Sequence, residues 1–197
     1  MTHLEQPDRA PSGGMTSNGA SDKQRLRTLL REARARRPAG ERTAFAERLA
    51  AWIPPEGTRR VSCFVGVGAE PDTGPLIAAL RDRHIEVLLP ITLPDFSLDW
   101  ALYTGHDDLV GARYGLLEPT GPRLGAAALA EVDIVIVPAL AVDAEGRRLG
   151  NGAGCYDRAL LHPKSDTPVL AVVFDDEQLS EALPEEPHDR RVDGFLL

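Results

Sequence analysis

The chain has 197 residues, of which 43% are hydrophobic, so it can bury one sizeable core in a single globular domain. Its formal net charge is −8 at pH 7. Nucleic acids and anionic membrane surfaces would be repelled at long range, and we expect neither as a partner. The two cysteines, Cys63 and Cys155, lack the spacing of a zinc site or of a disulfide framework. A reducing cytoplasm is therefore the expected location.

The N-terminal segment differs in composition from the rest of the chain. Residues 1–20 are rich in small and polar side chains and have no apolar core of the kind that a secretory signal requires. We interpret them as a disordered tail and residues 21–197 as a single α/β domain. Ser21 is suited to cap a first helix, which would end at Arg37 because Pro38 follows.

Beyond the first helix, helical and strand patterns alternate. Further helices are expected over residues 41–52 and 75–83. This alternation predicts an α/β protein, with a three-layer Rossmann-like fold whose central, mostly parallel sheet is flanked by helices. Ligands of such folds bind in the loops at the carboxyl ends of the strands. Strands are predicted for five short apolar or β-branched runs, at residues 61–67, 86–89, 97–103, 133–137 and 169–174.

The segment Arg148–Arg158, RLGNGAGCYDR, has three alternating glycines before an expected helix that contains Leu160 and Leu161. Glycine accepts positive φ and lets backbone N–H groups approach an anion, and a helix start adds partial positive charge. The segment is therefore a candidate phosphate-binding loop, with Arg148 and Arg158 on either side of the phosphates. An acid inside such a loop repels phosphate unless a divalent cation lies between them, which makes Asp157 a candidate magnesium ligand.

The residues of this loop leave other interpretations open. Closely spaced glycines also occur in ordinary turns, and Asp157 is equally suited to the first turn of a helix. Asp175 comes about twenty residues after the loop, where the acid of a dinucleotide-binding fold would hold a ribose. That fingerprint needs a tight turn between strand and helix, whereas about a dozen residues separate the preceding strand from Gly150. The position of Asp175 nevertheless leaves a dinucleotide-dependent oxidoreductase as an alternative function.

The surroundings of the loop carry a more specific pattern. Residues 138–143 (PALAVD), Gly146 and the loop itself resemble the signature of the 5-formyltetrahydrofolate cyclo-ligase family. Proteins of this family are α/β, and they convert 5-formyltetrahydrofolate to 5,10-methenyltetrahydrofolate while cleaving ATP to ADP and phosphate with magnesium. The resemblance therefore implies ATP and 5-formyltetrahydrofolate as substrates and Mg²⁺ as cofactor, and we expect a monomer. Other family-like elements follow in the family's order: Lys23 with Leu26-Arg27, residues 70–73 (EPDT), residues 114–119 (YGLLEP), and Asp189 with Val192-Asp193.

The resemblance also implies roles for individual residues. Arg148 and Glu70 would be catalytic, Glu70 facing the folate, and Asp157 and Asp189 would hold magnesium. The implied ATP-binding residues are Lys23, Arg27, Arg148, Leu149, Gly150, Asn151, Gly152, Ala153, Gly154, Cys155 and Tyr156. The implied substrate-binding residues are Glu70, Tyr114, Asn151 and Gly152. Without the resemblance, Lys23 and Arg27 would be read as part of an ordinary solvated helix face.

Three loop positions depart from the family pattern. Family members commonly have an aromatic residue at the position of Cys155, a larger or basic side chain at that of Asn151, and glycine or lysine at that of Ala153. These departures motivate a third function, a non-catalytic relative that binds folate or nucleotide without turnover. Cys155 beside a helix start is also a candidate nucleophile, although the resembled family needs no covalent enzyme intermediate.

Overall fold

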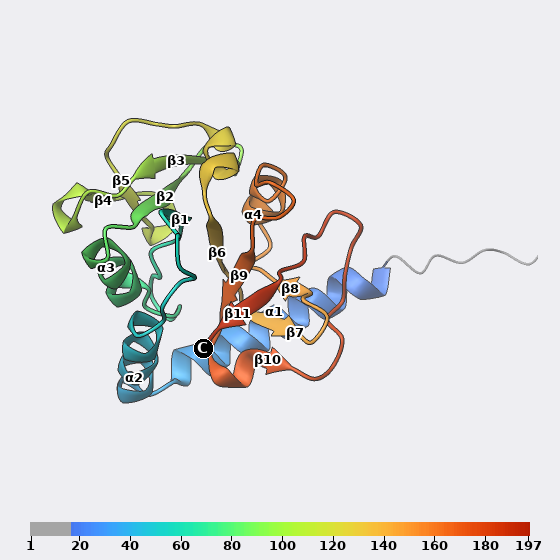
Figure 1. Ribbon diagram of the computed structural model, residues 1–197. Coiled ribbons are helices and arrows are strands. Elements are labelled where there is room, and N and C mark those ends of the chain that lie inside the picture. Colours follow the sequence, from blue (N-terminus) through green and yellow to red (C-terminus); the bar gives the residue numbers. More distant parts are fainter. Residues whose placement is uncertain (1–16) are drawn as a thin grey trace, which may run out of the picture.

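The computed structural model describes residues 17–197 and has a six-stranded sheet at its centre (Figure 1). The strand order is β11-β9-β6-β1-β2-β3. Neighbouring strands run parallel except β2 and β3, which are antiparallel. This arrangement confirms the predicted α/β fold with a mostly parallel central sheet. The strands are β1 (Arg60–Ser62), β2 (Glu86–Thr92), β3 (Leu98–Leu102), β6 (Ile134–Pro138), β9 (Val169–Val172) and β11 (Gly194–Leu196).

Helical elements cover both faces of the central sheet and complete three layers. Successive side chains of a strand point to opposite faces, and β6 shows this directly. Ile136 packs in one cluster with Phe45 of α2 and Leu80 of α3. Val135 packs in the cluster on the other face, with Leu129 of η3. The covering elements are α2 (Ala39–Ala50), α3 (Gly74–Asp82), the 3-10 segment η3 (Ala126–Glu131) and the short helix α4 (Cys155–Ala159).

Helix α1 (Ser17–Arg36) packs on a second, smaller sheet with strand order β10-β7-β8 (Figure 1). Leu26 and Leu30 of α1 contact a small core of Ala141, Leu149 and Leu183. In the part of the chain that the structure describes, no helix combines the length and the apolar character that a membrane span needs. The remaining strands are β7 (Ala141–Asp143), β8 (Arg148–Leu149) and β10 (Gln178–Leu179), with the hairpin β4 (Leu109–Gly111) and β5 (Leu117–Pro119).

Some predicted boundaries of the elements are wrong. Helix α1 begins at Ser17, four residues before the predicted cap Ser21, so residues 17–20 of the predicted tail are helical in the structure. The rest of the predicted tail, residues 1–16, lies outside the described residues. Helix α4 ends at Ala159 and does not include the predicted residues 160 and 161. Pro163 follows closely and has no backbone N–H to continue a helix.

The predicted strand over residues 61–67 is also shorter in the structure, since β1 ends at Ser62. The chain then leaves the sheet because its backbone finds partners in its own loop. The Thr73 hydroxyl donates to the Phe64 carbonyl oxygen and accepts the Gly66 N–H at 3.1 Å. At the other side of the sheet, β9 ends at Val172, two residues before the predicted end.

The buried Asp143 closes the turn between β7 and β8. Its Oδ1 accepts the backbone N–H groups of Glu145 and Arg147 at 2.9 Å, and its Oδ2 accepts that of Leu183 at 2.9 Å. Burial alone would raise the pKa of Asp143. The hydrogen bonds from Leu183 and Arg147 outweigh burial, so the pKa lies below its ordinary value.

A lowered pKa in the folded state makes Asp143 a pH-dependent source of stability. The unfolded chain takes up this proton more readily, so the stabilisation is complete above the ordinary carboxyl pKa of about 3.9 and is lost as the pH falls below it. We expect Asp143→Asn to lower the free energy of unfolding by about 1–3 kcal/mol at neutral pH, and by less at about pH 3. Urea titrations measure both values, with the exposed Asp166→Asn as control. An equal loss at both pH values would contradict this account.

Candidate active site

The carboxyl ends of β1 and β6 lie side by side, because these strands pair in parallel with Val61 opposite Ile134. From β1 the chain continues through α3 to β2 on one side, and from β6 it reaches β9 on the other. Ligands of open parallel sheets bind where the strand order reverses in this way. Glu70 follows β1, and the glycine loop follows β6 and the β7–β8 hairpin. The two segments meet, since Asn151 Nδ2 lies 3.3 Å from Glu70 Oε1.

The loop after β1 presents Glu70 from a closely packed backbone. A Cβ at Gly66 would lie only 1.9 Å from the Pro71 carbonyl oxygen, so the two parts of the loop touch. The Glu70 carboxylate also accepts the Val67 N–H at 3.2 Å. One oxygen of this carboxylate is thus held by its own loop, and the other faces the glycine loop.

Four cations of helix α1 contact the loops around the site. They are spaced by four, four and three residues: Lys23, Arg27, Arg31 and Arg34. Arg27 Nε donates to the Gly150 carbonyl oxygen at 2.9 Å. Arg31 Nη2 donates to the Asn151 carbonyl oxygen at 2.9 Å. The helix therefore fixes the first half of the glycine loop from outside, and these side chains are not simply solvated.

The contacts of Arg34 and Arg31 were not predicted from the sequence. The Arg34 guanidinium pairs with the buried Glu177 carboxylate at 2.7 Å and donates to the Ala139 carbonyl oxygen at 2.5 Å. Spacings of three and four residues place side chains on one helix face. This spacing from Lys23 onward was the signal that could have found both arginines.

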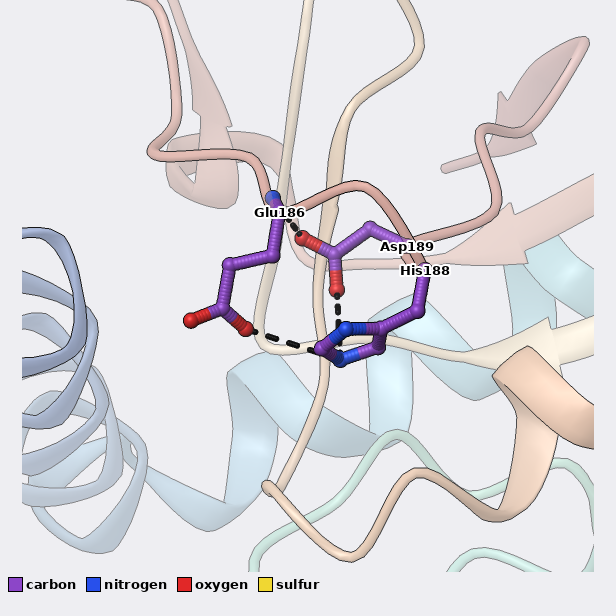
Figure 2. A group of neighbouring side chains, drawn as sticks. All are labelled: Glu186, His188 and Asp189. Atoms are coloured by element: carbon purple, nitrogen blue, oxygen red, sulfur yellow. Dashed lines mark hydrogen bonds and ion pairs between the residues drawn. The ribbon is translucent and has the colours of Figure 1, made fainter. Parts of the chain in front are cut away.

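Lys23, predicted to contact phosphate, lies buried between two carboxylates. Its Nζ is 3.1 Å from Glu186 Oε2 and 2.6 Å from Asp189 Oδ2. The side chains of Glu186, His188 and Asp189 point toward one another (Figure 2), and their ligand atoms lie within 4.8 Å of one another. The structure thus pairs the predicted phosphate ligand with the predicted magnesium ligand Asp189. The two carboxylates offer the oxygen donors that Mg²⁺ prefers.

The side chain of Arg148 is enclosed, at 3% exposure. Its Nη2 donates to Asp157 Oδ1 at 2.5 Å, and the Arg190 backbone N–H donates to the same oxygen at 3.2 Å. Burial lowers the pKa of Arg148, and the negative charge of Asp157 opposes that shift. Nε and Nη1 of Arg148 are buried and have no hydrogen-bond partner among the described residues. Phosphate oxygens are acceptors that could pair with such donors.

Tyr156 and Cys155 differ in what they can contribute. The Tyr156 hydroxyl is buried and unpartnered within the described chain, and burial raises its pKa well above the ordinary value. The phenol keeps its proton and can donate a hydrogen bond. Burial also raises the pKa of the Cys155 thiol, which is the opposite of the activation that a nucleophile needs. Cys155 is therefore a protonated thiol in this loop.

The glycine loop borders a depression with a volume of about 440 Å³. Gly152 and Gly154 have φ angles of 103° and 66°, a region in which residues with a Cβ are strained. Leu149 is buried in the small core, so only its backbone faces the loop. Helix α4 has only five residues and adds less dipole than the sequence suggested. The depression is lined by Gly152, Ala153, Gly154, Asp157, Arg158, Leu161, His188 and Arg190.

Tyr114 lies at the tip of the β4–β5 hairpin and is 70% exposed. Its ring stacks on Phe96, with the ring centroids 5.9 Å apart. Arg158 Nη2 donates to the carbonyl oxygens of Phe96, at 2.7 Å, and Ala153, at 3.2 Å. Arg158 therefore connects the aromatic pair to the glycine loop. Phe96 lies in the turn between β2 and β3 and carried no pattern that distinguished it in the sequence.

Asp175 does not fit the dinucleotide interpretation. It follows β9, but its carboxylate pairs with Arg48 of α2 at 2.5 Å. The glycine loop follows the β7–β8 hairpin, whereas a dinucleotide fingerprint joins a central strand directly to a helix. Neither element of that fingerprint is placed as the alternative requires.

The sequence model of the 5-formyltetrahydrofolate cyclo-ligase family matches residues 18–197. The chain belongs to this family. A 5-formyltetrahydrofolate cyclo-ligase from Mycolicibacterium smegmatis is 42% identical over 174 residues, which cover 85% of this chain and 89% of the relative. The Escherichia coli K12 protein of the same name is 33% identical over 147 residues, covering 73% and 80%.

Solved structures agree with this membership. The Aquifex aeolicus 5,10-methenyltetrahydrofolate synthetase is 26% identical, with a TM-score of 0.74 and coverage of 88% of both chains. The synthetase from Mycoplasma pneumoniae, at 16% identity, shares the fold with a TM-score of 0.69 and covers 88% of this chain and 97% of that one. The cyclo-ligase resemblance stated from the sequence is thereby confirmed, while the roles of single residues remain predictions.

Proposed function

We propose that this cyclo-ligase family member converts 5-formyltetrahydrofolate to 5,10-methenyltetrahydrofolate and cleaves ATP to ADP and phosphate. The observation that carries the proposal is the meeting of Glu70 with the glycine loop at the reversal of strand order. A carboxylate that can bind the folate ring is there adjacent to a loop that is flanked by the ion pair of Arg148 and Asp157. Both substrates would be held at one edge of the sheet.

In the proposed reaction, the formyl oxygen attacks the γ-phosphorus of ATP and ADP leaves with the electrons of the broken P–O bond. The folate N10 then attacks the activated formyl carbon and loses its proton, and phosphate departs as the ring closes. Positioning and charge neutralisation dominate such phosphoryl transfers. Arg148, Arg27 and the loop N–H groups would hold the phosphates, Tyr156 would donate from its hydroxyl, and Glu70 would orient the folate.

Lys23 would change partners in this scheme. It pairs with Glu186 and Asp189 in the structure, and an ATP phosphate would compete for the same ammonium. Asp157 and Asp189 are the residues that we assign to Mg²⁺, with Glu186 adjacent. Bound Mg²⁺ would offset the negative charge of the phosphates.

We propose a cytoplasmic monomer that acts without nucleic acid or a membrane. The net charge of −8 and the two free cysteines support this part of the proposal. A reducing compartment keeps such thiols free.

Release of ADP tests the function and separates it from its alternatives. The purified protein is incubated with ATP and Mg²⁺, with or without 5-formyltetrahydrofolate, and ADP is measured by a coupled assay. We expect ADP only in the presence of the folate. Binding of both substrates without ADP would identify a non-catalytic relative. Tight binding of NAD⁺ or NADP⁺ in place of ATP would favour the oxidoreductase.

A further inference from the structure

Three side chains from separate parts of the chain form a continuous hydrogen-bonded series. Arg31 of α1 donates from Nη2 to the Asn151 carbonyl oxygen at 2.9 Å. Its Nε and Nη2 also lie 3.2 Å from Asn151 Oδ1. On the opposite side of the same amide, Asn151 Nδ2 donates to Glu70 Oε1 at 3.3 Å. The series runs from a cation, through a neutral amide, to the carboxylate predicted to bind folate.

The chemistry of the two outer groups determines the orientation of the Asn151 amide. A guanidinium only donates hydrogen bonds, and an ionised carboxylate only accepts them. Asn151 must therefore present Oδ1 to Arg31 and Nδ2 to Glu70, and the flipped amide would lose both contacts. Aspartate at this position would remove the donor to Glu70, whereas alanine would remove both contacts of the side chain.

The second Glu70 oxygen accepts the Val67 N–H at 3.2 Å. With one oxygen held by its own loop and one by Asn151, the carboxylate plane has a defined direction. The contacts that link Arg31, Asn151 and Glu70 are not deep in the core, since Arg31 and Asn151 are both exposed. Exposed hydrogen bonds contribute little to folding stability, so their main consequence is orientation.

We propose that Arg31 and Asn151 are positioning residues, which orient the Glu70 carboxylate toward the folate substrate. This inference rests on the proposed function, because it concerns the same site and its folate. Arg31 touches neither substrate in this scheme and acts through Asn151. The neighbouring Arg27 holds Gly150 of the same loop, so helix α1 supports the nucleotide side and the folate side of the site with adjacent turns.

The proposal predicts a selective loss of folate affinity. Arg31→Ala and Asn151→Ala should each weaken the binding of 5-formyltetrahydrofolate by about 3- to 10-fold, the worth of one lost hydrogen bond. Because Arg31 acts through Asn151, the double variant should bind the folate no more weakly than Asn151→Ala alone. In Arg31→Ala, affinity for a non-hydrolysable ATP analogue should change by less than about twofold, and thermal stability should stay near that of the parent protein.

Calorimetric titration of 5-formyltetrahydrofolate and of the ATP analogue into the full chain tests this prediction. The series comprises the parent protein, the two single variants, the double variant and Arg25→Ala, which removes an exposed arginine from the same helix. We expect Arg25→Ala to match the parent. Additive losses of folate affinity in the double variant would overturn the inference, as would equal losses for both ligands in Arg31→Ala. Turnover of the parent protein is measured separately, so failure of this inference remains distinct from failure of the proposed function.

Discussion

Arg148→Ala is expected to lower kcat/KM for ATP by about 100- to 1000-fold, the cost of removing a preorganised charge-stabilising donor from an enclosed site. The side chain is 3% exposed, and among residues 17–197 only one of its nitrogens has a partner, Asp157 Oδ1 at 2.5 Å. Within the described residues, the remaining donors Nε and Nη1 are buried and unpaired. We infer that these donors are kept for phosphate oxygens.

Arg148→Lys is the matched variant for this prediction. Lysine keeps the charge and loses the planar fork, so we expect it to restore only part of the activity. Steady-state kinetics with each substrate varied in turn measure the effect, and titration of the folate gives its affinity. Equal loss of ATP use and folate binding would show that the loop has collapsed, and normal kinetics in Arg148→Ala would refute the assignment.

Arg34→Ala is expected to lower the free energy of unfolding by about 3–5 kcal/mol, because it leaves a buried carboxylate without its counter-ion. Glu177 is 2% exposed and lies 2.7 Å from Arg34. The same guanidinium donates to the Ala139 carbonyl oxygen, which would also lose its partner. For a protein of this size, such a loss lowers the melting temperature by about 6–20 °C.

Arg36→Ala provides the control for the Arg34 prediction. Arg36 is exposed on the same helix and lies 3.8 Å from the exposed Glu32, a surface contact worth about 0.3–0.5 kcal/mol. Urea denaturation and thermal scans of both variants measure the difference. If Arg34→Ala and Arg36→Ala melted within a degree or two of each other, the buried pair would not stabilise α1 against the sheet.

Five of the six strands of the central sheet were predictable because they are apolar or β-branched runs, whereas β11 (Gly194–Leu196) was not predicted. The run at residues 133–137 corresponds closely to β6 (Ile134–Pro138). Strands β7, β8 and β10 have only two or three residues each. A segment of two or three residues cannot show the alternation of side chains by which strands are recognised in a sequence. These three strands are instead stabilised by the leucines of α1 that pack on them.

The candidate site was only partly predictable for a related reason. The composition of the glycine loop was visible in the sequence, and its place at the sheet edge follows from the topology. The pairing of Lys23 with Asp189 joins residues 166 positions apart, and neither residue signals the other. A basic helix face is usually solvated, but the fold buries Lys23 to 4% exposure. Arg31 and Asn151 likewise acquire their partners only through folding.

The formation of methenyltetrahydrofolate tests the central claim most directly. Purified protein is mixed with 5-formyltetrahydrofolate and Mg²⁺, first without ATP and then with it, and the absorbance of the methenyl product is followed. We predict growth of this absorbance only after ATP is added. No growth with ATP, in a sample shown to be folded, would contradict an active cyclo-ligase and would leave a binding protein of the same family.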